Sequence, residues 1–295
     1  MSQAKGYASV LQVGAEAVAY GTKAASLASI PIISHTLKPK QAQAVPEVIG
    51  IGRDAPEPQD FEKGAEGDVV VPLDGVSFAT WLDTVFDTGI RKDVQGSLSL
   101  QDPIASVKAN QYLGMKIARM AFSFKKGQQP RCTISLVGAG GTAETAIVPV
   151  AITAFKPFLS HQLAITLDET PVTNFTGFDL TIDFGLAAGS DFVISGGATR
   201  VCLSEGEIAV TGTITALFDD AALQTLAIAR TTFALGWTLT NDEYILTCTL
   251  AEVKAGDFTQ DLPGPGGRFI SIPFTAFWAA DAANSSVQLS IAAVV

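Results

Sequence analysis

Basic residues and closely spaced cysteines are both scarce in this 295-residue sequence. It has 19 Lys and Arg against 29 Asp and Glu, a net charge of -10, and no basic stripe. Clustered positive charge supplies affinity for phosphates, so its absence argues against a nucleic-acid-binding protein. The three cysteines, Cys132, Cys202 and Cys248, are widely spaced, which excludes a disulfide framework and a CxxC metal pair. We expect them to be buried, reduced thiols.

Long apolar runs are also missing. No stretch approaches the roughly 18 apolar residues of a membrane span. Gly14, Glu16 and Gly21 interrupt the N-terminal region before a signal-peptide core could form. We therefore expect no membrane insertion, and a chain that stays in a reducing aqueous compartment or in something assembled there.

Strand patterns dominate what is present. In "FDLTIDF", residues 178–184, apolar and polar side chains alternate strictly, as they do in "EIAVTGTIT", residues 207–215. This period of two predicts half-buried strands with one polar face. Further strand candidates are "DVVVPL", "RCTISLV", "YILTCTL" and "RFISIPFTAF", separated by turn-rich segments.

Two segments have helical spacing. "SFATWLDTVF" begins at Ser77, a candidate N-cap, and "DDAALQTLAIA" begins at Asp219 and Asp220, either of which can cap. Capping explains this aspartate pair better than a carboxylate dyad or a metal ligand does. Two short helices among about a dozen strands predict a mainly β protein.

The order of elements repeats along the chain. "EGDVVVPLDGVSFATWLDTVF" starts at Glu66 and "EGEIAVTGTITALFDDAALQTL" starts at Glu205, and each runs from a strand into one helix. A hairpin pattern follows each helix. Self-similarity of this kind indicates a duplicated unit. We expect an N-terminal arm at 1–28 and two tandem β-rich domains at 29–165 and 170–295.

Motifs for chemistry are weak. Gly138, Gly140 and Ala143 form a GxGxxA pattern, but β-branched residues and a proline follow instead of a helix, so a hairpin or loop is the better interpretation. His35 and His161 are the only histidines, and neither has a neighbour at metal-ligand spacing. The sequence therefore assigns no catalytic, cofactor-binding or metal-binding residue, and we expect no cofactor and no enzyme.

The N-terminal 55 residues or so resemble the start of tail tube proteins of siphophages, whose tails are long and non-contractile. Short motifs recur there in the family's order, and the C-terminal half carries a similar set in "FTGFDLTIDFG", "EGEIAVTGTITALFDD" and "GGRFISIPFTAFW". The N-terminal motifs are Gly14, Glu16, Tyr20 to Thr22, Ile30, Pro31, Ser34, Leu37, Lys38, Gly52 and Arg53.

The resemblance implies a small β-sandwich with one packed helix in each domain, and a hairpin that joins neighbouring subunits into a β-barrel channel. Duplicated members of this family form trimeric rings with pseudo-sixfold symmetry, and single-domain members form hexamers. The repeat found here points to stacked trimers, with a hexamer as the alternative. It further implies a virion tail protein assembled in the host bacterial cytoplasm, which serves genome ejection and contacts tape-measure, tail-terminator and distal tail proteins.

Barrel closure also agrees with physical chemistry, because it removes exposed strand edges and about two dozen strands leave an aqueous lumen. If polar strand faces line that lumen, Asp179, Asp183 and Glu207 are candidate acidic residues there. They would repel phosphate, so that phage DNA passes without specific binding. The alternative is that they are ordinary solvated side chains.

Two other functions fit parts of the sequence. A β-sandwich module that binds carbohydrate or a surface would expose aromatic residues on one loop face, whereas we expect Trp81, Trp237 and Trp278 to be core or interface anchors. A hydrolase would need a serine or carboxylate arrangement around His35 or His161.

Overall fold

The computed structural model describes residues 10–16, 19–47, 54–105, 108–145, 152, 155–186, 198–217, 222–261, 268–279 and 285–294. These residues form antiparallel strands with two α-helices among them, which confirms the mainly β prediction. Gly52, Arg53, Asp219 and Asp220 lie outside the described residues.

We call the chain up to β11 the first half and the chain from β12 the second half. The elements of the first half are β1 (Leu11–Ala15), β2 (Ala28–Ile30), β3 (Ser34–His35), β4 (Lys38–Ala44), β5 (Gln59–Pro72), α1 (Phe78–Val85), β6 (Phe86–Asp87), β7 (Ile90–Arg91), β8 (Leu98–Ala105), β9 (Lys108–Lys125), β10 (Arg131–Gly138) and β11 (Gly140–Thr145). Those of the second half are β12 (Leu163–Leu167), β13 (Thr170–Val172), β14 (Phe175–Asp183), β15 (Ala209–Leu217), α2 (Ala222–Ala229), β16 (Thr232–Thr240), β17 (Tyr244–Ala255), β18 (Thr259–Asp261), β19 (Phe269–Ala276) and β20 (Gln288–Ala293).

The six strand segments expected from alternation all fall in strands. The segment at 178–184 overlaps β14 to within one residue of its end, and "DVVVPL", "RCTISLV", "YILTCTL" and "RFISIPFTAF" likewise match β5, β10, β17 and β19 to within one residue at each end of the segment. The strand expected at 207–215 begins two residues later, at Ala209. In β10 the burial alternates residue by residue, which is the pattern of a strand with one face on the core.

The two halves have the same order of strand pairing. In the first half β1 pairs with β2 and β8, β8 with β9, β9 with both β11 and β10, β10 with β5, and β5 with β3 and β4. In the second half β12 pairs with β13 and β16, β16 with β17, β17 with both β20 and β19, β19 with β15, and β15 with β14. The strands of these two series correspond by their neighbours, with β14 matching β3 and β4 together, whereas β6 and β7 have no counterpart among the described strands of the second half.

A glycine fixes the correspondence residue by residue. Gly67 in β5 faces Leu136 of β10, and Gly212 in β15 faces Phe274 of β19. At both glycines an added Cβ would collide with a neighbouring strand or side chain, at 2.6 Å from the Leu37 Cα and at 2.3 Å from the Phe274 ring. The register therefore matches Gly67 with Gly212. Aligning the two sequence segments at Glu66 and Glu205 gives a different correspondence from the strand register, because Glu66 lies inside β5 whereas Glu205 precedes β15.

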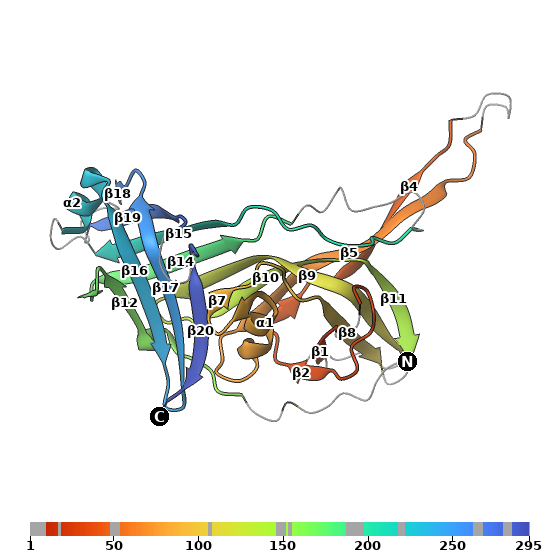
Figure 1. Ribbon diagram of the computed structural model, residues 1–295, viewed down its shortest axis with the longest axis horizontal. Coiled ribbons are helices and arrows are strands. Elements are labelled where there is room, and N and C mark those ends of the chain that lie inside the picture. Colours follow the sequence, from red (N-terminus) through yellow and green to blue (C-terminus); the bar gives the residue numbers. More distant parts are fainter. Residues whose placement is uncertain are drawn as a thin grey trace.

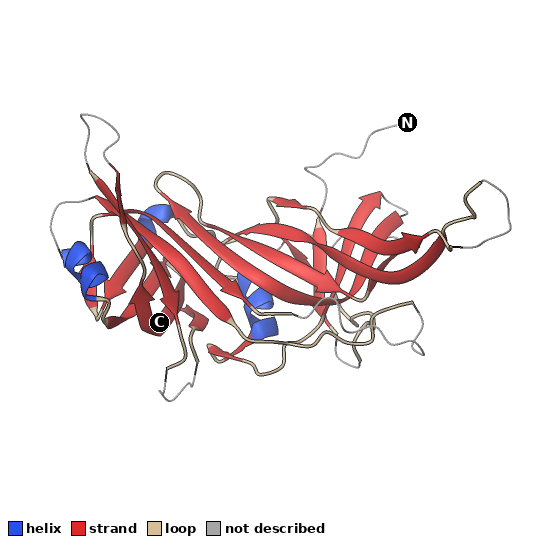
Figure 2. Cartoon of the chain, turned by 90° about the horizontal axis from the view of Figure 1, so that it is seen from above, coloured by secondary structure: helices blue, strands red, loops and turns tan. Residues whose placement is uncertain are grey.

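The two halves are joined edge to edge. β14 pairs with the second part of β9 over seven residue pairs, from Gly177 opposite Lys125 to Asp183 opposite Arg119. The strands β4, β5, β10, β9, β14, β15 and β19 consequently form one continuous curved sheet through the molecule (Figure 2). This sheet is not closed within one chain.

Aromatic side chains from both halves pack beneath this joint. Phe122 and Phe124 of β9 lie 5.8 Å and 5.1 Å from the ring of Trp237, measured between ring centroids. Phe178 of β14 lies 5.8 Å from Phe124. All of these rings are buried, so the two halves share one core.

Helix α1 lies against this core. Trp81, Leu82 and Val85 are buried, and Phe78 meets Phe122 edge to face. Ser77 occupies the N-cap position, but its side chain makes no capping hydrogen bond. The buried Asp74 instead accepts hydrogen bonds from the backbone N–H groups of Val76 and Ser77 and stabilises the turn into the helix.

Part of the expected N-terminal arm at 1–28 belongs to the sheet, because β1 lies within it and pairs with β8 and with β2, which begins at Ala28. The expected boundary near 165–170 falls in the hairpin of β12 and β13. We group β12 and β13 with the second half by their pairing order, and the expected domain bounds at 165 and 170 stay a prediction. At the other end, β4 and the first part of β5 extend away from the body (Figure 1), and all seven residues of β4 are exposed.

Candidate assembly surfaces

One face of the continuous sheet is polar and open. Asp179 and Asp183 of β14 are exposed on it, whereas Glu207 is exposed just before β15 begins. The same face also carries basic residues that the sequence did not single out. Its basic side chains include Lys38, Lys40, Arg119, Lys125, Arg131 and Lys254, and its acidic side chains include Glu66, Asp68, Asp179 and Asp183. The face is therefore of mixed charge rather than uniformly acidic.

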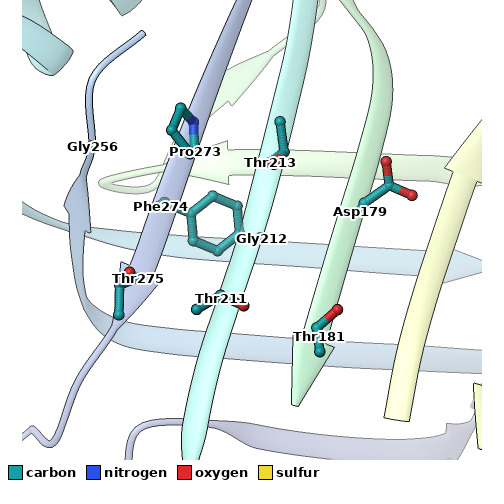
Figure 3. Close-up of a pocket in the computed structure, with 9 residues that line it drawn as sticks. All are labelled: Asp179, Thr181, Thr211, Gly212, Thr213, Gly256, Pro273, Phe274 and Thr275. Carbon is teal, nitrogen blue, oxygen red and sulfur yellow. The ribbon is translucent and has the colours of Figure 1, made fainter. Parts of the chain in front are cut away.

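Two shallow hollows on this face lie at corresponding places. The first spans β14, β15 and β19 (Figure 3), and its lining residues are Asp179, Thr181, Thr211, Gly212, Thr213, Gly256, Pro273, Phe274 and Thr275. The second is lined by Thr36, Lys38, Glu66, Gly67, Asp68, Ser135, Leu136 and Val137. Gly67 and Gly212 hold the same place in the two sets. The repeated backbone geometry thus produces a repeated surface.

Two strand edges of the sheet have no partner strand in the part of the chain that the structure describes. One is the outer edge of β3 and β4, which pair only with β5. The other is the outer edge of β18, which pairs only with β19. Within the chain, the counterparts of these edges are β14 and the second part of β9, and those two pair with each other. An unpaired edge of this kind exposes backbone N–H and C=O groups that can bind another strand.

Lysines and a glutamate lie at the first edge. Lys40 donates a hydrogen bond to Glu66 at 2.7 Å, and Lys38 lies 3.5 Å from the same carboxylate. The pKa of Glu66 is lowered, chiefly because of this hydrogen bond from Lys40. Asp257 near the second edge pairs with Arg230. Lys40, Asp257 and Arg230 are largely exposed, so each pair contributes little to stability in the isolated chain.

A largely buried ion pair fastens the segment before β15 to β9. Lys116 donates to Glu205 at 2.7 Å and to the carbonyl of Leu203 at 3.1 Å. The carboxylate of Glu205 also accepts from the backbone N–H of Gln95 at 2.9 Å. The side chains of Lys116 and Glu205 are only 10 % and 17 % exposed. Sequence reasoning gave Glu205 only a place in a repeat and missed this link, because its partner is 89 residues away.

The N-terminal motif residues have a structural role. Glu16 accepts hydrogen bonds from the backbone N–H groups of Gly21 at 2.9 Å and Gly114 at 2.8 Å. Gly114 has a positive φ of 64° and lies against the ring of Tyr20, which leaves no room for a Cβ. Glu16, Tyr20 and Gly21 therefore tie the segment after β1 to the middle of β9.

The residues considered for chemistry are dispersed. His35 Nε2 lies 3.5 Å from Asp102 Oδ2, and His161 lies exposed in a short 3₁₀ turn. Gly138 ends β10 and Gly140 begins β11, so no helix follows the GxGxxA pattern. The pattern is not the expected hairpin or loop either, because a single residue separates the two strands and both pair with β9. Among the described residues, no group of three or more His, Cys, Asp or Glu could hold a metal ion.

The cysteines and tryptophans partly follow expectation. Cys132 and Cys248 are buried, but Cys202 is exposed, so the prediction of three buried thiols is wrong for Cys202. Trp81 and Trp237 are core residues, whereas Trp278 is 61 % exposed just after β19.

Comparison with known proteins identifies the family. The family model of phage tail tube proteins matches residues 6–276, which is most of the chain. The chain belongs to this family. The resemblance seen in the sequence is thereby confirmed at the family level, and a self-assembling structural component of a phage tail follows from it. A search of curated proteins found no match. None of the described helices in this tail tube protein is long and apolar enough to cross a membrane.

Proposed function

We propose that the protein is the major tail tube subunit of a non-contractile phage tail, and that it stacks as rings into the channel for genome ejection. The observation that carries this proposal is the joint between β9 and β14. One chain already pairs two equivalent four-strand units edge to edge, and in the described part of the chain one further edge of each kind has no partner strand. Repeating the same joint between chains would lengthen the sheet until it closes into a ring.

The repeated pairing order supports two tandem domains that arose by duplication. With two such units per chain, three chains supply the six units that a hexamer of single-domain subunits would supply. A closed trimer is therefore the favoured ring, and a hexamer is the alternative. Native mass spectrometry of assembled rings distinguishes three from six chains of 30.7 kDa each.

The polar face of the sheet is the natural lining of the channel, because the opposite face is occupied by the shared core. We propose that Asp179 and Asp183 face the lumen together with Arg119 and Lys125, and that Glu207 lies at the end of the same surface. Interspersed charges of both signs give DNA no extended basic patch to bind. The genome can then slide through without specific contacts.

Stacked rings also imply contacts at the two ends of the tube. Tape-measure, tail-terminator and distal tail proteins are the proposed partners there. Assembly takes place in the host bacterial cytoplasm and involves no catalytic step.

Negative-stain microscopy of the purified full chain tests the proposal that the protein forms rings. We expect rings or tubes with an open centre, and a protein that stays monomeric over a wide range of concentration and salt would refute it.

A further inference from the structure

The internal joint between β9 and β14 has a defined charge polarity. On the polar face, Asp183 of β14 lies directly opposite Arg119 of β9. The β14 strand contributes the acid and the β9 strand contributes the base. Side chains directly opposite each other in an antiparallel pair have Cβ atoms about 5 Å apart, so opposite charges stabilise the pairing and like charges oppose it.

The counterpart of Asp183 on the free edge of the first half is Lys40. Gly212 faces Leu180, and Gly67 faces Leu37 by the register of β3 and β4 with β5. Three residues further along, Leu180 leads to Asp183 and Leu37 leads to Lys40. An acidic position in the internal joint is thus a basic position at the free edge.

The counterpart of Arg119 on the other free edge is Asp257. In the first half one extra residue is inserted in β9 between Ile117 and Arg119, opposite the step from Leu136 to Ser135. The second half has one extra residue between Ala255 and Thr259, opposite the three steps from Phe274 to Ser271. The extra residue of the first half is Ala118, and we assign the extra residue of the second half to the corresponding position, Gly256. Asp257 then corresponds to Arg119.

We propose that the outer edge of β3 and β4 pairs with the outer edge of β18 in a second copy of the chain, in the register of the internal joint, with Lys40 opposite Asp257. The charge polarity of this joint is the reverse of the internal one. This inference rests on the proposed ring and adds its register and its specificity. The reversal distinguishes the two joints, because every incorrect combination places like charges together.

The incorrect combinations are of two kinds. A β4 edge that displaced β14 from β9 would place Lys40 opposite Arg119, and a β14 edge that met β18 would place Asp183 opposite Asp257. Either error would pair β9 or β14 with a strand of another chain instead of with each other, and the two halves of one chain would then separate. Charge repulsion at these positions favours rings in which the first and second halves alternate.

At the β4 edge, backbone hydrogen bonds alone distinguish the correct partner edge from an incorrect one less well than the charges do. Pro39, next to Lys40, has no N–H to donate, so the external joint has fewer available ladder hydrogen bonds than an edge without proline. In the separate chain, Lys40 and Asp257 are held by Glu66 and Arg230. Glu66 lies on β5 next to β4, and Arg230 lies just before β16, so both partners can remain in the assembled joint as a four-residue network.

Charge reversal and charge exchange test the proposal in the full chain. Lys40→Glu and Asp257→Lys are each expected to raise the protein concentration needed for half-maximal ring formation by about fivefold or more. The double variant Lys40→Glu/Asp257→Lys restores an opposite-charge pair across the joint and is expected to assemble at a lower protein concentration than either single variant. Full recovery is not expected, because each exchanged charge lies beside a like charge of its own chain, Glu66 or Arg230. Lys126→Glu and Asp242→Lys, both on exposed turns, are the matched controls and should assemble like the wild type.

A covalent readout separates register from general electrostatics. In a Cys202→Ser background, Lys40→Cys/Asp257→Cys should form disulfide-linked chains in assembled tubes, and Lys126→Cys/Asp257→Cys should not. Thermal unfolding of each unassembled variant checks that it is folded. If wild-type tubes form but the exchange fails to rescue and residues 40 and 257 do not cross-link, this inference is wrong and the proposed function stands. If the wild type forms no ring, both proposals fall.

Discussion

At the scale of single residues, two glycines decide how the strands approach each other. A Cβ on Gly212 would lie 2.3 Å from the Phe274 ring and 2.5 Å from the Asp179 carbonyl oxygen. Gly67 faces the same restriction from the backbone of Leu37 and Thr36. The repeat at Glu66 and Glu205 includes Gly67, but the sequence does not show why a glycine is needed there. The atoms that exclude a side chain at this position come from other strands.

Gly212→Ala is expected to lower the free energy of unfolding by about 1–3 kcal/mol, because the added methyl group overpacks the sheet. Gly140→Ala is the control, since no atom lies within 4 Å of the added Cβ. Chemical denaturation of the two variants measures the difference. Equal stabilities would show that the strands can separate at Gly212 without cost.

The three thiols are expected to differ in reactivity. Burial raises the pKa of Cys132 and Cys248, so little of the reactive thiolate is present near neutral pH, whereas Cys202 is exposed. Maleimide labelling of the native protein followed by mass spectrometry should therefore modify Cys202 alone. Labelling of Cys132 or Cys248 before unfolding would contradict the burial seen here, and unfolded protein provides the three-site control.

At the scale of elements, β9 organises the fold. Its first part pairs with β8 and β11, and its second part pairs with β10 and β14. The ion pair of Lys116 and Glu205 adds a third attachment in the middle of this strand. The strand candidates and both helices were predictable from residue periodicity, but the change of partners along one 18-residue strand was not.

Breaking the buried pair should be costly. Glu205→Gln or Lys116→Met alone is expected to destabilise the protein by about 3 kcal/mol, because the remaining charge stays largely buried without its ion-pair partner and keeps only its hydrogen bond to the backbone. The double variant should lose less than the sum of the two single losses. Glu243→Gln serves as the control, since Lys156 and Glu243 are about half exposed and their pair should contribute little to stability. Additive losses in a denaturation cycle would exclude the coupling.

At the scale of the whole molecule, the unpaired edges and the net charge have opposite effects on association. Edge pairing favours contact between chains, and the net charge of -10 on each chain opposes it. The attraction between the two lysines at the β4 edge and Asp257 acts only when the strand edges meet. The repulsion between the net charges acts at longer range, while the chains are still approaching each other. The balance between them sets the rate of assembly.

Tube formation is consequently expected to accelerate severalfold when salt is raised from about 20 to about 200 mM, because screening shortens the range of repulsion. Light scattering with time measures the rate, and electron microscopy checks that the products are tubes. Sucrose solutions of matched viscosity without added salt are the control. A slower rate in higher salt would mean that ion pairs across the joints outweigh the repulsion between chains.

The sequence by itself determined the local structure, the mainly β class and the family, since alternation, helical spacing and turn residues act between near neighbours in the chain. It also contained the repeated order of elements. Only the tertiary structure decided the register between the halves, the joint of β9 with β14, the mixed charge of the polar face and the burial of Lys116 with Glu205. These features depend on which distant strands meet, and one bulge or one shifted residue changes every opposing pair along a strand.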